Sequence, residues 1–206
     1  ECAVLANDEL FVGMRDAVRV LDVATGTVKR EIADRHDDVA LDANGRVLAC
    51  SHRTSVVFRD AATLAPLGAP VEVGAGSVNA IAALPDGRFV VGTERGELAI
   101  LASTNGAWAR TWHLHAHGRD RLERGNPHAD VCSLVVSRDG SRFVSAATDR
   151  TVRVWDVRDS AGPTPMLRRP LTRPTEELRR PLTRPTEMLR RPLTRPTGRL
   201  RRPLTR

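Results

Sequence analysis

Turn signals of the Asn-Gly or Asp-Gly type recur along this chain, each between two short apolar stretches. They are Asn44-Gly45, Asp86-Gly87 and Asp139-Gly140. Such dipeptides favour tight turns between antiparallel strands, because Gly, Asn and Asp tolerate a positive φ. A third apolar stretch follows in each unit, and a related unit with Asn7-Asp8 at its turn opens the chain. The repetition predicts four strand-rich units and therefore an all-β fold built from repeats.

The spacing of these units is nearly constant. Their third apolar stretches end at Leu21, Arg59, Leu101 and Trp155, in steps of 38, 42 and 54 residues. Fourth strands are expected at residues 28–32, 70–73 and 109–114. Units of four strands at a period of about 40 to 45 residues are typical of β-propeller blades.

The last unit carries a more specific motif. Residues 149–156 form a β-branched stretch that ends on Trp155-Asp156, and this stretch resembles the third strand of the WD40-repeat family. The resemblance implies an all-β, WD40-like β-propeller segment of four four-stranded blades. We place the blades at about residues 1–33, 34–75, 76–117 and 128–172, with a loop insertion at 118–127 and low-complexity repeats at 173–206. The insertion accounts for the long third step.

The resemblance also implies a hydrogen-bonded chain of four side chains in the last blade. The matching residues are His117, Ser145, Asp149 and Trp155. A buried imidazole and a buried indole N–H need hydrogen-bond partners, so the implied role is structural. In the other three blades Leu21, Arg59 and Leu101 stand in place of Trp. We expect those blades to rely on packing alone.

Metal binding and catalysis find little support in the sequence. His113, His115 and His117 alternate, so on a strand they would share one face, and imidazoles suit zinc or copper. No Cys or carboxylate cluster completes a ligand set, and we expect a solvated edge at His113 and His115 instead. No Gly-rich phosphate loop or Gly-x-Ser-x-Gly elbow occurs. We therefore predict no catalytic residue, no metal, no cofactor and a protein that is not an enzyme.

The net charge of +7 is unevenly divided. Residues 166–206 contain 13 Arg and three Glu, a net charge of +10, whereas residues 1–165 carry 19 basic and 22 acidic groups. From Leu167 an 11-residue unit repeats, and its prolines forbid a continuous helix. The first copy, at about 166–172, is expected to be the outer strand of the last blade, and the rest to be disordered.

Three further features concern the cellular setting. Cys2, Cys50 and Cys132 are odd in number and far apart, which predicts buried, reduced thiols in a cytoplasmic protein. No apolar run reaches the roughly 18 residues that a membrane span requires. The start has neither a signal peptide nor an initiator Met, so we expect a fragment or a processed piece.

A non-catalytic protein-protein interaction scaffold, as part of a larger signalling protein, is the function that the resemblance implies. The protein partner would contact the insertion, whose charged residues are Arg119, Asp120, Arg121, Glu123 and Arg124. Anion or nucleic-acid binding through the Arg-rich tail is the alternative, although the tail lacks aromatic residues for base stacking. A propeller hydrolase or lactonase-like metal enzyme is a third reading.

Overall fold

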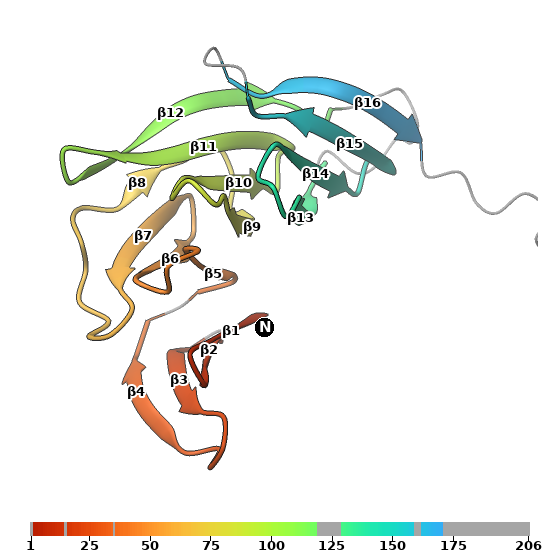
Figure 1. The fold of residues 1–206 in the computed structure, drawn as a ribbon. Coiled ribbons are helices and arrows are strands. Elements are labelled where there is room, and N and C mark those ends of the chain that lie inside the picture. Colours follow the sequence, from red (N-terminus) through yellow and green to blue (C-terminus); the bar gives the residue numbers. More distant parts are fainter. Residues whose placement is uncertain (1, 15, 35, 119–128, 159–161, 171–206) are drawn as a thin grey trace, which may run out of the picture. The chain divides into compact units, whose positions relative to one another are not determined.

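The computed structural model describes residues 2–14, 16–34, 36–118, 129–158 and 162–170, which contain sixteen strands (Figure 1). The strands form four antiparallel sheets, each with its four strands in chain order. The chain divides into Glu1–Leu171, which holds the sheets, and residues 172–206. The tail that the sequence predicts to be disordered therefore lies outside the described residues.

The strand bounds are as follows. Sheet 1 contains β1 (Cys2–Ala6), β2 (Glu9–Gly13), β3 (Val18–Asp22) and β4 (Val28–Ile32). Sheet 2 contains β5 (Val39–Leu41), β6 (Val47–His52), β7 (Ser55–Asp60) and β8 (Val71–Glu72). Sheet 3 contains β9 (Val78–Ala83), β10 (Phe89–Thr93), β11 (Glu97–Thr104) and β12 (Ala107–His115). Sheet 4 contains β13 (Val131–Val136), β14 (Arg142–Ala147), β15 (Thr151–Asp156) and β16 (Thr164–Pro170). The all-β fold of four-stranded units is thus confirmed.

The recurring turn signals join the first and second strands of the sheets. Gly140 has a φ of +68° in the turn between β13 and β14, and its N–H donates to the carbonyl of Ser137 at 2.9 Å. Asn7 and Asp8, between β1 and β2, also have positive φ values, of 49° and 61°. Tight turns of this kind match the twist of the flanking strands, which explains why the local sequence predicts them well.

Burial shows how the sheets are stacked. Every residue of β10 is buried, because sheet 3 packs against sheet 2 on one face and sheet 4 on the other. In β1 and β13 the pattern differs: Leu5 is 63% exposed and Val135 is 61% exposed. Both residues point away from the neighbouring sheet, since successive side chains of a strand face opposite sides. Among the described residues, sheets 1 and 4 therefore each leave one face open.

Three hydrophobic clusters join consecutive sheets. The cluster between sheets 1 and 2 includes Phe11, Val18, Val20, Val39 and Leu48. The cluster between sheets 2 and 3 includes Phe58, Val71, Ile81, Phe89 and Leu101. The cluster between sheets 3 and 4 includes Val90, Leu98, Ile100, Phe143 and Trp155. Each fully buried large side chain contributes about 1.5–3 kcal/mol, so these interfaces supply most of the driving force for folding.

The first strands of neighbouring sheets, β1, β5, β9 and β13, lie next to one another (Figure 1). This close approach depends on glycine. A Cβ on Gly92 of β10 would lie 2.5 Å from Cγ1 of Val131, the first residue of β13. A Cβ on Gly13 of β2 would lie 2.8 Å from Sγ of Cys2 and 3.0 Å from Cγ1 of Val39. The two glycines thus occupy comparable places beside the next sheet.

The expectation of three buried thiols holds for Cys50; Cys2 is half-buried, and the expectation is wrong for Cys132, which is exposed. The strand pairing shifts by one residue between Val131 and Ser133, so Cys132 is the extra residue of a β-bulge. All three cysteines are free. Within the described residues, no helix is long and apolar enough to cross a membrane.

Candidate functional site

His117 is held in place by the turn between β10 and β11. The backbone N–H groups of Ala116 and His117 donate to the carbonyl of Gly96, at 2.9 and 2.8 Å. Gly96 has a φ of +78°, and a Cβ there would overlap the carbonyl oxygen of His117. Glycine is therefore required, and its contacts direct the His117 side chain from sheet 3 toward sheet 4.

The four residues of the expected polar chain come together in sheet 4. Ser145 Oγ lies 2.7 Å from Nε2 of His117 and accepts the indole N–H of Trp155 at 2.9 Å. The other ring nitrogen of His117, Nδ1, lies 3.2 Å from Oδ2 of Asp149. Since a carboxylate only accepts, Nδ1 carries the proton and the Ser145 hydroxyl donates to Nε2. Thr151, absent from the expected set, joins the chain: its Oγ1 lies 3.0 Å from Nδ1 and donates to Asp149.

Aromatic packing completes the surroundings of Trp155. The ring of Phe143 stacks on it with centroids 5.8 Å apart, and Trp112 of β12 meets it edge-on at 6.2 Å. Trp155 is 0% exposed. An indole N–H at such depth would be strongly destabilising without an acceptor, and Ser145 supplies one.

The contacts from Ser145 to His117 to Asp149 follow the same order as in a hydrolytic triad. Burial distinguishes the two cases, because a nucleophile must reach its substrate. Ser145 and His117 are both 0% exposed, and the Ser145 oxygen already binds the Trp155 indole. The geometry therefore fits a buried link between sheets 3 and 4 better than a reaction centre.

The described residues on either side of the predicted partner loop lie beside the turn that holds His117. Arg119, Asp120, Arg121, Glu123 and Arg124 all lie outside the described residues. The residues flanking the segment 119–128 are described, and both Ala116 and Ala129 are buried, at 2% and 6% exposed. A Cβ on Gly96 would also approach that of Ala129 to 3.1 Å, so His117 and Ala129, which lie on either side of the segment, both contact one turn of sheet 3.

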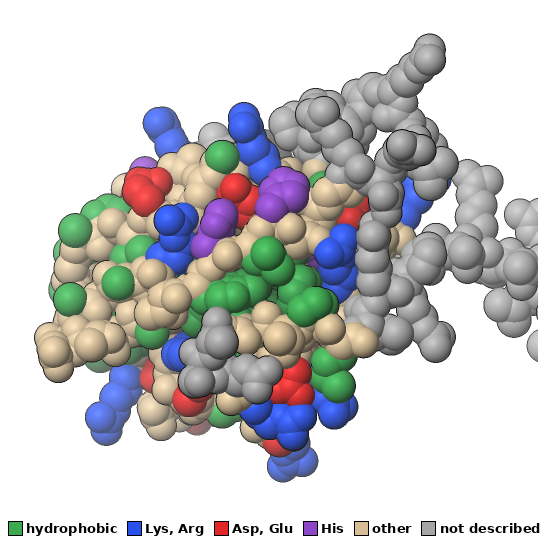
Figure 2. All heavy atoms as spheres, turned by 90° about the horizontal axis from the view of Figure 1, so that it is seen from above, with side chains coloured by type: hydrophobic (Ala, Val, Ile, Leu, Met, Phe, Trp, Pro, Cys, Tyr) green, Lys and Arg blue, Asp and Glu red, His purple; other side chains and the backbone are tan. Residues whose placement is uncertain are grey.

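His113, His115 and His117 do not share one face, and His113 and His115 lie on a solvated edge, as expected. β12 ends at His115, and His117 is turned into the core, while His113 and His115 stay exposed. Figure 2 looks down on the side where β12 and β16 lie uppermost in Figure 1, and shows histidine side chains and basic Lys or Arg side chains around hydrophobic ones. His113 faces Glu97, with Nε2 3.5 Å from Oε1.

Sequence reasoning missed a second polar network, in sheet 2, where packing alone was expected. In sheet 2, Arg59 lies opposite Leu48 on the neighbouring strand. In sheet 4, Trp155 lies opposite Phe143 in the same way, so Arg59 occupies the position that Trp155 has in sheet 4. Its guanidinium donates to Oδ2 of Asp34 at 3.1 Å and to the carbonyl of Leu64 at 3.1 Å. Asp34 lies in the connection between sheets 1 and 2, much as His117 connects sheets 3 and 4. The sequence feature that could have indicated this network is the Arg at the position where the last blade has Trp.

Buried ionisable groups surround that network. Cys50 stands two residues after Leu48, as Ser145 stands two residues after Phe143. Burial raises the pKa of the Cys50 thiol to about 12 and lowers the pKa of His36. At neutral pH, Cys50 is therefore a protonated thiol and His36 a neutral imidazole.

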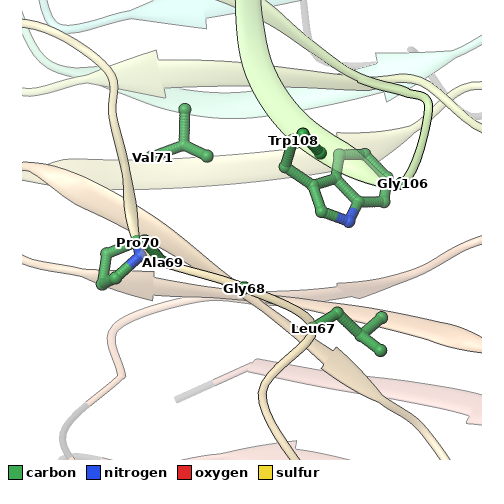
Figure 3. A pocket seen from close by; sticks show the side chains of 8 residues that line it. Leu67, Gly68, Ala69, Pro70, Val71, Gly106 and Trp108 are labelled. Atoms are coloured by element: carbon green, nitrogen blue, oxygen red, sulfur yellow. The ribbon is translucent and has the colours of Figure 1, made fainter.

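A shallow groove of about 440 Å³ lies between residues 67–71 and residues 106–108 (Figure 3). The ring of Trp108 forms one side and stacks on Phe58 with centroids 3.7 Å apart. None of the lining residues has an ionisable side chain, so this groove offers an apolar packing surface without an acid, base or nucleophile.

Comparison with known proteins agrees with this geometry. Residues 121–156, which include β13, β14 and β15, match the family model described as the WD domain, G-beta repeat. The match identifies a repeat of this type within residues 121–156. The matched segment begins after His117. The His117 side chain therefore contacts sheet 4 from a residue that lies outside the match. A search of curated proteins gives no match.

Proposed function

We propose that this chain is a non-catalytic protein-interaction scaffold. WD40-repeat domains generally serve as such scaffolds, and the buried polar chain of sheet 4 is the observation that favours this role here. The groups that resemble a reaction centre, Ser145, His117 and Asp149, bind one another inside the fold. The loops that connect the strands of this framework then recognise the protein partner.

The segment 118–127 is the partner-binding loop in this proposal. Its flanking residues Ala116 and Ala129 are buried against the Gly96 turn, which anchors the loop at both ends. A loop that begins and ends close together on a rigid sheet loses less conformational entropy on binding than a free tail does. The charged residues at 119, 120, 121, 123 and 124 offer both signs of charge to a polar partner surface.

The open faces of sheets 1 and 4 support the finer part of the proposal. Leu5 and Val135 are large, apolar and more than half exposed. Exposed apolar side chains on open sheet faces favour packing against a further sheet. We infer that these faces contact further propeller blades, that the chain acts as part of a larger signalling protein, and that it works in the cytoplasm.

The experiment compares partner capture by two variants of the immobilised chain. In the first, Arg119, Asp120, Arg121, Glu123 and Arg124 are all replaced by Ser. In the control, Asp86 and Arg88 are replaced by Ser, which removes an exposed ion pair from the turn at the other end of β10. Partners identified by mass spectrometry should be lost from the first variant and kept by the control, with Tm unchanged in both. Equal capture by both variants would refute the proposed loop.

A second candidate, anion binding through the tail, is favoured by the net charge of +10 in residues 166–206. Retention of single-stranded RNA on filters, titrated with salt, tests it. Binding that shows a steep salt dependence and disappears in a chain ending at residue 172 would favour this function. The scaffold proposal predicts no difference in partner capture between the two chains.

A further inference from the structure

Three potential metal ligands come together at the junction of sheets 1 and 2. Asp34 and His36 lie in the connection between β4 and β5, and His52 is the last residue of β6. One ligand atom of each lies within 4.8 Å of the other two. Among the residues that the structure describes, no other group of three His, Cys, Asp or Glu side chains has this arrangement.

The tautomer of His36 suits metal binding. Its Nδ1 lies 2.5 Å from the backbone carbonyl of Ser51, and a carbonyl can only accept, so Nδ1 carries the proton. The lone pair of the neutral ring is then on Nε2. Metal-bound histidines commonly donate their other N–H to a backbone carbonyl, which fixes both the tautomer and the ring orientation.

The free nitrogen of His36 faces a carboxylate. Nε2 lies 3.3 Å from Oδ2 of Asp34, and Nδ1 of His52 lies 3.4 Å from Oδ1 of the same residue. Both nitrogens are buried and have no hydrogen-bond partner, and the His36 side chain is 0% exposed. A lone pair opposite a carboxylate is unfavourable unless a proton or a metal cation lies between them.

One pair of ligand atoms also has the spacing of a coordination sphere. Ligand atoms about 2.0–2.1 Å from a tetrahedral zinc ion are separated by roughly 3.3–3.4 Å. The 3.4 Å between Nδ1 of His52 and Oδ1 of Asp34 falls at this value, and Nε2 of His36 lies 3.3 Å from the other oxygen, Oδ2. We propose that Asp34, His36 and His52 bind a divalent transition-metal ion of the zinc type, with a fourth position open to water.

Arg59 lowers the metal affinity of this site and orients the Asp34 carboxylate. Its guanidinium donates to Oδ2 of Asp34, so Oδ1, on the side of His52, is the oxygen left for the ion. A hydrogen bond to a ligating carboxylate holds it in place, whereas the positive charge opposes a cation. The affinity should therefore be lower than at a site with thiolate ligands. The bound ion would connect the link between sheets 1 and 2 to β6.

The test uses the tag-free chain with Cys132 replaced by Ser, which removes the exposed thiol. Co²⁺ is the spectroscopic probe and Zn²⁺ the probe for thermal unfolding. We expect the intense visible absorption of tetrahedral Co²⁺, and a Tm that rises by about 5 °C when Zn²⁺ is near a hundredfold over its Kd. The absence of both effects would overturn the proposal.

Two variants locate the site. His52→Ala changes a half-exposed residue and should weaken metal binding at least about tenfold. His113→Ala is the matched control, because His113 is similarly exposed and also faces a carboxylate. Equal binding by both variants would overturn the assignment. X-ray absorption of the zinc-loaded protein gives a readout independent of any variant: nitrogen and oxygen neighbours are expected, and sulfur neighbours would exclude this site.

Discussion

The hydroxyl of Ser145 lies 2.7 Å from Nε2 of His117, although 28 residues separate them in the chain. This contact joins the connection after sheet 3 to the second strand of sheet 4, next to the insertion. It therefore links the stability of the last sheet to the placement of the loop to which we assign partner binding.

Replacing Ser145 by Ala should destabilise the fold. The change leaves the Trp155 indole N–H and Nε2 of His117 without their shared partner in a fully buried place. The expected loss is about 1–3 kcal/mol of unfolding free energy, measured by chemical denaturation. Ser133→Ala, at an exposed position of β13, is the control and should change stability by less than about 0.5 kcal/mol. Similar effects of both changes would argue against the polar chain as a stabilising element.

Gly92→Ala tests the close approach of sheets 3 and 4. The new Cβ would lie 2.5 Å from Cγ1 of Val131, so one of the two strands must shift. Overpacking of this kind costs about 1–3 kcal/mol, observable as a lower Tm. Gly118→Ala is the comparison, since its Cβ would have 3.6 Å to the nearest atom of His115. If Gly92→Ala proved as stable as Gly118→Ala, the described contact of β10 with β13 would be wrong.

Acid should weaken the turn of sheet 4. Hydrogen bonds from Ser137 and Ser141 lower the pKa of Asp139 from 3.8 to about 2. Between these two pH values the unfolded chain binds more protons than the folded chain, so stability falls as the pH falls. We expect a progressive loss of Tm from about pH 4 to pH 2, with a shallower loss in Asp139→Asn. An identical acid profile in this variant would show that the carboxylate does not contribute.

Self-association should depend on the open face of sheet 4. Val135 is 61% exposed on that face, and the half-buried side chains of Val144 and Val154 lie on the same side. We expect concentration-dependent association of the chain in analytical ultracentrifugation, and a shift toward monomer in Val135→Lys. Val23→Lys, 51% exposed in the turn after β3, is the control and should leave association unchanged. If Val135→Lys left self-association unchanged, the contact between chains would not involve this face of sheet 4.

Local chemistry explains how much of the fold could be read from the sequence. The Asp139-Gly140 turn and its relatives fix hairpins within a few residues, and β-branched residues mark the strands between them. His117 could be matched across the insertion because the residue types of its partners were known in advance from the family resemblance. These features depend on short stretches or on a stated pattern.

The features that sequence reasoning missed depend on contacts between distant segments. Arg59 reads as a solvent-exposed residue in an irregular repeat, and only the fold brings its guanidinium to Asp34. His36 precedes β5 and His52 is the last residue of β6, so no spacing rule joins them. Cys132 reads as a core residue of a strand, and the bulge between Val131 and Ser133 turns it outward. Register shifts of one residue are invisible in composition or periodicity.

The most direct test of the scaffold proposal is the Kd of a captured partner, measured by calorimetry for the wild-type chain and for the variant with Ser at residues 119, 120, 121, 123 and 124. The scaffold proposal predicts at least about tenfold weaker binding, equivalent to about 1.4 kcal/mol, with an unchanged Tm. The same Kd for both proteins would contradict it.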